Sequence, residues 1–203
     1  MLHDNQNNEP TECRPQDGAQ DATRRRLLAG GSAAVVLAVK SGSALAGGYC
    51  VSPSAFSSIQ AFTHASQKPI TQYPRCSSRG YYGNSGIADD VRTARWSPID
   101  FNTATLGSPG HSPSPFAPIP GGYTASSKLL DVLRSGSASD VAPDLVTLYL
   151  DVVTGKSQGF ISVEDVADLW AIAFGGTPLQ SQFSTWTPGD VRDYLDITVT
   201  PQP

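Results

Sequence analysis

The chain has 203 residues, with 14 Lys and Arg against 18 Asp and Glu, and therefore a formal net charge of −4. This mildly acidic balance argues against a nucleic-acid-binding protein, which needs a basic surface. Only 16% of the residues are charged, and the chain contains 19 Gly and 16 Pro. This composition is typical of a globular domain with long irregular stretches, rather than of a helical bundle or a wholly disordered chain.

Residues 1–46 have the organisation of an export signal that is removed from the mature protein. A polar leader over residues 1–22 is followed by arginines, by the apolar run 27–39 and by small residues that fit a cleavage site. A basic stretch, an apolar stretch and an Ala-x-Ala ending define a secretory signal peptide. The apolar run is too short to cross a hydrocarbon core, which takes about 20 residues. We therefore expect export without a stable membrane anchor, and the signal residues are Arg24, Arg25, Ala44 and Ala46.

The string Thr23-Arg24-Arg25-Arg26-Leu27-Leu28 resembles the twin-arginine export signal of bacteria. The resemblance implies that the twin-arginine translocation machinery is a partner during export, and that the mature protein is periplasmic or extracellular. An ordinary secretory signal with an additional arginine is the alternative, and it also predicts export.

The mature part of the chain keeps two cysteines, Cys50 and Cys76, whereas Cys13 lies in the leader. An even pair in a chain bound for an oxidising compartment predicts a disulfide. Closing a loop of this length stabilises a fold by about 3–4 kcal/mol in the chain-entropy estimate. A catalytic thiol and a metal-binding pair are the alternatives, but there is no Cys-x-x-Cys, and His64 is the only imidazole between the two cysteines. We predict a structural bridge and no metal or cofactor.

The mature chain, residues 47–203, is long enough for one domain with its own core, and we expect a mainly α fold. Residues 47–96 are a Cys-bounded segment, irregular apart from a short helix near residues 87–95. Residues 97–125 contain six prolines, a density that excludes helix and central strand and predicts a long loop. Apolar residues within this loop indicate that it wraps over a small helical bundle formed by residues 126–197.

Start and stop signals place four amphipathic helices in that bundle. The first lies around Leu129 to Leu133, and the second begins at Pro143 and ends at Gly155. Ser162 and Thr187 each stand three residues before an Asp, in patterns that predict the starts of the third and fourth helices.

Residues 154–165, between two of these helices, look like a degenerate EF-hand loop. Gly159 and Asp165 fall in the expected register, whereas Lys156 and Gln158 stand where calcium needs oxygen ligands, mostly carboxylates. A calcium module is therefore an alternative, and a plain helix–loop–helix turn is the favoured interpretation.

His111 is the candidate for chemistry in the proline-rich loop. Together with the Asp89 and Asp90 pair it could serve a small periplasmic enzyme of the hydrolase type, but the sequence around Ser85 lacks the residue order and scaffold of a serine hydrolase. Cationic and aromatic residues could instead form a surface that binds a sugar or a peptide. That set is Arg79, Tyr81, Tyr82, Trp96 and His111. Its alternative role is to cover the disulfide-bounded segment.

Two motifs of the mature chain resemble a group of uncharacterised bacterial proteins that are exported by the twin-arginine route. The first is Cys50-Val51-Ser52-Pro53, and the second is a cysteine before a Gly-Tyr-aromatic segment, here Cys76-Ser77-Ser78-Arg79-Gly80-Tyr81-Tyr82. The resemblance implies a small exported domain with a Cys pair and a helical C-terminal part, and it carries over no catalytic residue. We expect a non-enzymatic protein with a binding or surface-structural role.

Overall fold

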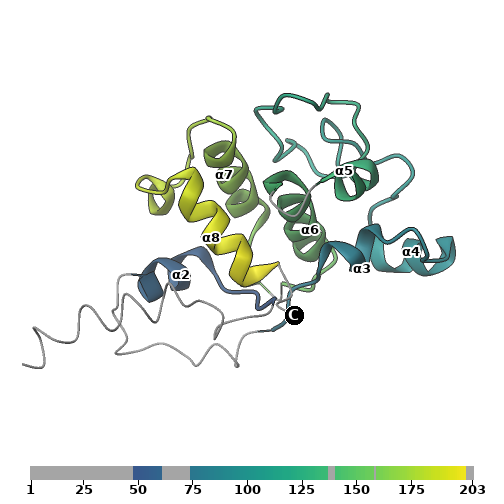
Figure 1. The fold of residues 1–203 in the computed structure, drawn as a ribbon, viewed down its shortest axis with the longest axis horizontal. Helices are drawn as coiled ribbons and strands as arrows, with labels where there is room; N and C mark the ends of the chain where they lie inside the picture. The colour runs from purple at the N-terminus through teal and green to yellow at the C-terminus, as the bar shows by residue number, and fades with distance from the viewer. Residues whose placement is uncertain (1–47, 61–73, 137–139, 158, 200–203) are drawn as a thin grey trace, which may run out of the picture. The chain divides into compact units, whose positions relative to one another are not determined.

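The computed structural model describes residues 48–60, 74–136, 140–157 and 159–199, all within the unit of residues 43–203. Residues 1–47, which include the predicted signal residues, lie outside the described residues, as do His64 and Gln158. Figure 1 shows the elements, which are α2 (Pro53–Gln60), α3 (Arg79–Gly83), α4 (Asp89–Trp96), α5 (Leu129–Ser135), α6 (Val141–Val153), α7 (Val163–Ala173), the 3-10 turn η4 (Ser181–Phe183) and α8 (Pro188–Thr198).

The described part of the chain is helical, which confirms the predicted class. Its β pairing is confined to isolated bridges, one between Tyr49 and Arg75 and one between Thr105 and Lys128. Among the described residues, no helix has both the length and the apolar composition that crossing a membrane requires.

Helix α6 is the central helix, since it is buried on all sides although one of its faces carries polar side chains. Residues 142–151 are all buried, as expected of a helix that is surrounded by other elements. It contacts α3, α5, α7 and α8, and Figure 1 shows it between α7 and α5. The Asp140 side chain caps it by accepting a hydrogen bond from Ala142 N at 3.2 Å. The predicted start at Pro143 is therefore wrong by two residues, since this cap starts the helix at Val141.

The local start signals of α7 and α8 are confirmed. Ser162 Oγ accepts from Asp165 N at 3.1 Å, and the Asp165 carboxylate accepts from Ser162 N at 2.9 Å. The same reciprocal capping box joins Thr187 and Asp190 at the start of α8. Each box satisfies backbone N–H groups that a helix start would otherwise leave without partners.

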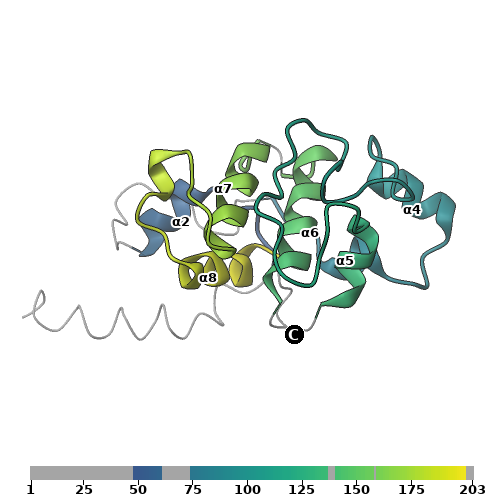
Figure 2. The same cartoon turned by 90° about the horizontal axis from the view of Figure 1, so that it is seen from above.

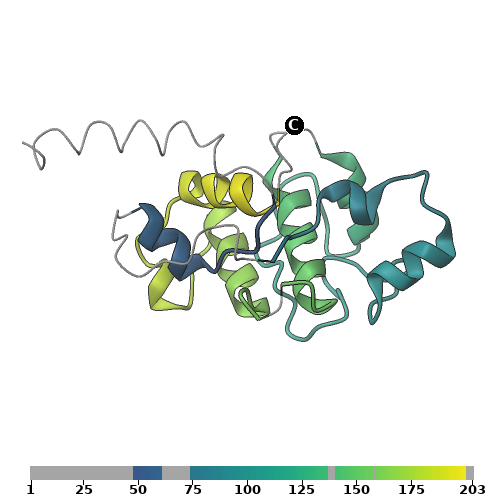
Figure 3. The same cartoon turned by 90° about the horizontal axis from the view of Figure 1, so that it is seen from below.

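Helices α2 and α3 lie in the segment that we expected to be irregular. Phe56 of α2 is 1% exposed, and its ring lies 5.3 Å from the Tyr194 ring of α8 and 5.4 Å from the Trp186 ring. Figure 3 shows α2 beside α8. These aromatic contacts supply the burial that stabilises α2, whose own sequence is a poor helix former.

The proline-rich segment 97–125 contains neither helix nor strand, as predicted. Phe116 is 1% exposed, and its ring lies 5.1 Å from the Tyr149 ring of α6 and 4.8 Å from the Trp170 ring of α7. Figure 2 shows this loop beside both helices. Tyr149 Oη donates a hydrogen bond to the Pro109 carbonyl of the loop at 2.9 Å, and Trp170 Nε1 donates to the Pro118 carbonyl at 2.8 Å.

Candidate functional site

The Cys50–Cys76 disulfide joins the segment before α2 to the segment before α3, as predicted. The two Cα atoms lie 5.0 Å apart, and Cys50 is completely buried. Backbone bonds flank the bridge, because Cys50 N donates to the Pro74 carbonyl at 2.7 Å and Cys76 N donates to the Gly48 carbonyl. Cys50 Sγ lies 3.9 Å from the backbone carbonyl oxygen of Lys156. Cys50 is thus part of the folded interior, and the half-buried Cys76 packs against it.

Helix α6 carries a row of buried polar side chains, whose two carboxylates bond to the segment that follows this bridge. Asp144, Thr147 and Asp151 recur at i, i+3 and i+7, which places them on one face of the helix. Buried carboxylates need hydrogen-bond or charge partners, since leaving them unpaired is costly. Those partners come from residues 77–82, so this row marks where the disulfide-bounded segment docks on α6.

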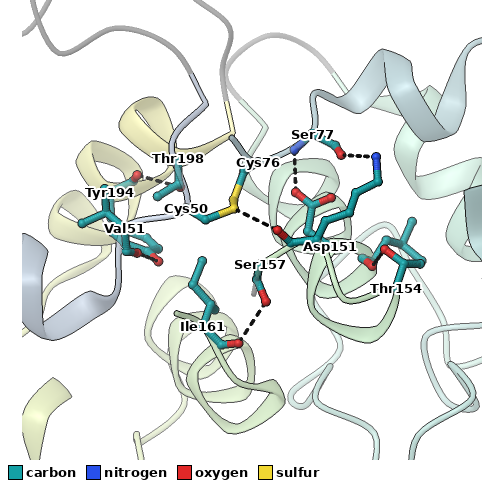
Figure 4. Close-up of a disulfide and its surroundings, with 12 residues drawn as sticks. Cys50, Val51, Cys76, Ser77, Asp151, Thr154, Ser157, Ile161, Tyr194 and Thr198 are labelled. Atoms are coloured by element: carbon teal, nitrogen blue, oxygen red, sulfur yellow. Dashed lines mark hydrogen bonds between the residues drawn. A yellow bond between two sulfur atoms is a disulfide. The ribbon is translucent and has the colours of Figure 1, made fainter. Parts of the chain in front are cut away.

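Asp151 forms the centre of the larger polar group. Its carboxylate accepts from Ser77 N at 2.6 Å and from Tyr82 Oη at 2.8 Å, and Asp151 has no exposed surface. Figure 4 shows Ser77 and Asp151 beside the disulfide. Burial raises the pKa of Asp151, while the bonds from Ser77 and Tyr82 and the charge of Lys156 oppose that shift. Burial is the dominant cause, so the neutral form of this carboxyl gains relative to the charged one.

Tyr82 links Asp151 to the C-terminal end of α6. Its hydroxyl lies 3.0 Å from Thr154 Oγ1, and Thr154 Oγ1 donates to the Leu150 carbonyl at 2.6 Å. Tyr82 is fully buried, and burial first, then the charge of Asp151, raises the pKa of its phenol. The phenol therefore stays neutral and acts as a hydrogen-bond group within the interior.

Lys156 completes this group from the loop after α6. Its Nζ lies 3.3 Å from Ser77 Oγ and 3.2 Å from the centroid of the Tyr81 ring. Arg95 Cζ lies 4.3 Å from the same centroid. Cations are attracted to aromatic faces, so Tyr81 holds two of them. We call Ser77, Tyr82, Asp151, Thr154 and Lys156 the Asp151 cluster.

The Asp151 cluster contains the groups of a Ser–Lys nucleophile, because the Ser77 hydroxyl and the Lys156 amine are within hydrogen-bond reach. A lysine that acts as a general base must, however, be uncharged to accept a proton. The aromatic face of Tyr81 and the carboxylate of Asp151 both attract positive charge instead. Ser77 is also only 8% exposed. The arrangement is better suited to holding chain segments together than to transferring a proton.

Arg79, the first residue of the predicted ligand surface, is held by Asp144 of α6. Its Nε and Nη2 donate to the two carboxylate oxygens, and its Nη2 also donates to the Asp140 carbonyl. The hydrogen bond with Asp144 is the main reason why the pKa of Arg79 is raised. Asp144 is 7% exposed, so this pair ties the start of α3 to α6 within a largely closed environment.

The other members of the predicted surface fall into different surroundings. Tyr82 and Trp96 are completely buried, and Trp96 Nε1 donates to the Tyr82 carbonyl at 3.3 Å. Tyr81 is half-buried between its two cations. His111 is exposed on the proline-rich loop, with Nδ1 3.2 Å from the Pro113 carbonyl. The rings of Tyr82 and Trp96 therefore belong to the interior of the Cys-bounded segment and do not form a surface with His111.

An open hollow of about 490 Å³ lies at Arg79, between α3 and α5. Its lining consists of Arg79, Gly80, Gly83, Asn84, Ser85, Leu133 and Arg134. Arg134 is exposed, and its Nε donates to the Gly83 carbonyl at 2.9 Å. Gly83 allows the close approach of α5, because a Cβ atom at this position would lie 3.1 Å from Leu133 Cβ. Sequence reasoning missed Arg134, since this contact between the helices depends on tertiary packing.

The residues of the two alternative sites take structural partners. Asp89 accepts from Arg92 Nη1 at 2.6 Å. In the EF-hand-like segment Gly159 has a φ of 78°, which suits a tight turn. The Asp165 carboxylate, however, accepts from Ser162 N and from the side-chain amide of Gln182 at 2.9 Å. This carboxylate is a helix cap, so the favoured helix–loop–helix interpretation accounts for its contacts.

Comparison of the chain with models of protein families, with curated proteins and with solved structures gives no match. Functional inference therefore rests on the geometry of the disulfide, the Asp151 cluster and the hollow at Arg79.

Proposed function

We propose that the chain is an exported bacterial protein whose mature form, residues 47–203, is a non-enzymatic binding domain of the periplasm or the extracellular space. Residues 1–46 act as its twin-arginine signal, the translocation machinery is its partner during export, and the proline-rich loop wraps over the helical bundle. The observation that carries this proposal is the Cys50–Cys76 disulfide, of which Cys50 is completely buried and Cys76 half-buried.

The position of the disulfide supports maturation in an oxidising compartment. Cys50 is completely buried, and the bridge lies beside the Asp151 cluster, which connects the same segment to α6. Disulfides of this kind persist outside the cytoplasm, where thiols are not kept reduced.

The hollow at Arg79 supports a binding role with an anionic ligand. Arg134 presents an exposed guanidinium there, and Asn84 and Ser85 offer further hydrogen-bond groups. A planar guanidinium suits carboxylate and phosphate groups, which it can bind through two parallel hydrogen bonds. The non-enzymatic proposal has a second version, in which the domain has a structural role at the cell surface and binds no small ligand.

The export route is tested by changing the paired arginines while keeping their charge. In a bacterial host with a twin-arginine system, Arg24→Lys combined with Arg25→Lys is expected to leave the precursor in the cytoplasm. Arg26→Lys is the matched control and is expected to be exported normally. Continued export of the paired variant would contradict the twin-arginine route. Cytoplasmic retention of the wild type, the paired variant and Arg26→Lys alike would contradict export itself.

The binding role is tested by calorimetric titration of the oxidised chain with inorganic phosphate and with glutarate, a dicarboxylate. We expect at least one of these probes to bind, and Arg134→Ala to weaken that binding by about tenfold, in keeping with the loss of a charge-assisted hydrogen bond. Arg192→Ala removes one exposed positive charge from α8 and is the matched control. Equal weakening by both variants, or no heat from either probe, would contradict an anion site at this hollow.

A further inference from the structure

The disulfide and the Asp151 cluster together have the geometry of a second kind of site. One ligand atom each from Cys50, Cys76 and Asp151 lies within 4.8 Å of the other two. Before oxidation the cysteines are thiols, and thiolates with a carboxylate are a ligand set that zinc accepts. We infer that the reduced chain binds one Zn²⁺ through Cys50 Sγ, Cys76 Sγ and a carboxylate oxygen of Asp151.

The distances allow such a site after small side-chain rotations. Zinc–sulfur bonds of about 2.3 Å in a tetrahedral arrangement place two sulfurs about 3.8 Å apart and a sulfur and an oxygen about 3.5 Å apart. The sulfurs are bonded to each other in the disulfide and must move apart once it is reduced, whereas a carboxylate oxygen of Asp151 already lies within 4.8 Å of both. Backbone bonds to Pro74 and Gly48 hold the main chain of both cysteines in place. The fourth position is left for water or for the Lys156 carbonyl, whose oxygen is 3.9 Å from Cys50 Sγ.

The charges around the site also balance. Two thiolates and one carboxylate carry three negative charges, and Zn²⁺ together with the Lys156 ammonium carries three positive ones. Lys156 Nζ lies 3.3 Å from Ser77 Oγ, and Ser77 N donates to Asp151 at 2.6 Å, so the amine is near the site before the metal enters. Binding replaces the proton on each thiol, and that on the Asp151 carboxyl where it is protonated, by a bond to zinc and releases these protons to solvent, with no change of oxidation state. The soft thiolates favour zinc over magnesium or calcium.

The place of this site in the life of the protein follows from the proposed export and rests on it. Cysteines are kept reduced in the cytoplasm, so the chain would carry free thiols until it is exported. Zinc would then hold together the same two segments that the disulfide joins later. The metal chemistry itself does not depend on the export route and can be tested without it.

The test uses the full chain with Cys13→Ser, so that Cys50 and Cys76 are its only cysteines. A phosphine reduces the disulfide to two thiols and is itself oxidised to the phosphine oxide with water as the oxygen donor. Titration with Co²⁺ is expected to give one bound cobalt per chain with a thiolate-to-cobalt charge-transfer band, which Zn²⁺ then abolishes. The chain that has not been reduced is expected to show no such band.

Variants separate this site from adventitious thiol binding. Asp151→Asn is expected to weaken cobalt binding by at least about tenfold, because it removes a ligand. Asp131→Asn, which changes an exposed carboxylate of α5, is the matched control and is expected to leave binding unchanged. Equal binding by both variants, absence of the thiolate band, or the same binding by the oxidised chain would overturn the inference.

A second measurement does not depend on how the variants fold. Zn²⁺ is expected to raise the melting temperature of the reduced parent chain, or to restore its helical circular dichroism if reduction has unfolded it. No effect of zinc on either signal would overturn the inference. These results are independent of the arginine variants that test export, so failure of one proposal is distinguishable from failure of the other.

Discussion

Replacing Asp151 with Asn tests whether the charge of this carboxyl is unfavourable in the folded chain. Burial raises the pKa of Asp151 above its ordinary value, so the folded chain takes up a proton at a higher pH than the unfolded chain does. Asn cannot titrate, but it can accept the bond from Ser77 N and donate to the Tyr82 oxygen. Tyr82 then donates to Thr154 Oγ1, 3.0 Å away. Asp151→Asn therefore removes the titrating carboxyl and keeps the hydrogen bonds to Ser77 and Tyr82.

The sign of the pH effect follows from which state binds more protons. Between the unfolded pKa, about 3.9, and the raised folded pKa, the folded chain holds the additional proton. The free energy of unfolding of the wild type therefore falls as pH rises through this window, by up to about 1.4 kcal/mol for each step of one in pH. The stabilisation that comes from protonating Asp151 is complete below the pKa of the unfolded chain and is lost above the pKa of the folded chain.

The assay is urea unfolding of the oxidised wild type and Asp151→Asn between acidic and neutral pH. Titrating groups common to both chains cancel when the two free energies of unfolding are subtracted. We expect the free energy of unfolding of the variant to increase relative to that of the wild type as pH rises. A tenfold change in the acid dissociation constant of Asp151 on folding corresponds to about 1.4 kcal/mol, or roughly 0.7 M urea for an m-value of about 2 kcal/mol/M. A difference that is flat with pH, or that grows in favour of the wild type, would refute the reasoning, because it would mean that Ser77, Tyr82 and Lys156 stabilise the anion at least as much as burial destabilises it.

Three further predictions concern stability, each measured by urea unfolding. In a Cys13→Ser chain, Cys50→Ala with Cys76→Ala is expected to lower the free energy of unfolding by about 3–4 kcal/mol, because the crosslink no longer restricts the unfolded state; a loss below about 1 kcal/mol would contradict this. Arg79→Lys is expected to cost about 1–2 kcal/mol, because lysine cannot make both bonds to the buried Asp144 carboxylate, whereas the exposed Arg192→Lys is expected to be neutral. Gly107→Ala would place a Cβ atom 2.9 Å from Ala125 Cβ and 3.0 Å from its carbonyl oxygen and is expected to cost about 1–3 kcal/mol. Gly121→Ala, with nothing within 4 Å, is its control and is expected to change stability by less than about 0.5 kcal/mol; equal effects of the two alanines would show that the crowding is relieved at no cost.

The features that could be predicted from the sequence are those set by nearby residues. The capping boxes at Ser162 and Thr187 involve partners three residues away, so their patterns specify the helix starts directly. The density of prolines in residues 97–125 excludes regular structure whatever the tertiary context is. The start of α6 differs from the prediction because Pro143 suits a first helical position, whereas the Asp140 cap decides the actual one.

The Asp151 cluster could not be predicted because its members lie far apart in the chain. Ser77 and Asp151 are separated by 74 residues, and their bond exists only because the disulfide-bounded segment docks on α6. The spacing of Asp144, Thr147 and Asp151 was a usable signal, since it interrupts an otherwise apolar helix on one face. In a single sequence such a stripe is also typical of a solvent-facing surface. Burial of the whole circumference of α6 decides between the two interpretations.

The central claim is that this chain matures by cleavage and oxidation outside the cytoplasm. Its most direct test is intact-mass analysis, with and without a thiol-alkylating reagent, of the protein recovered from the cells that produce it. We predict a chain that begins at Gly47, lies outside the cytoplasm and gains no alkyl group unless it is first reduced. A cytoplasmic chain that retains Met1 and is alkylated at both Cys50 and Cys76 without reduction would contradict the account.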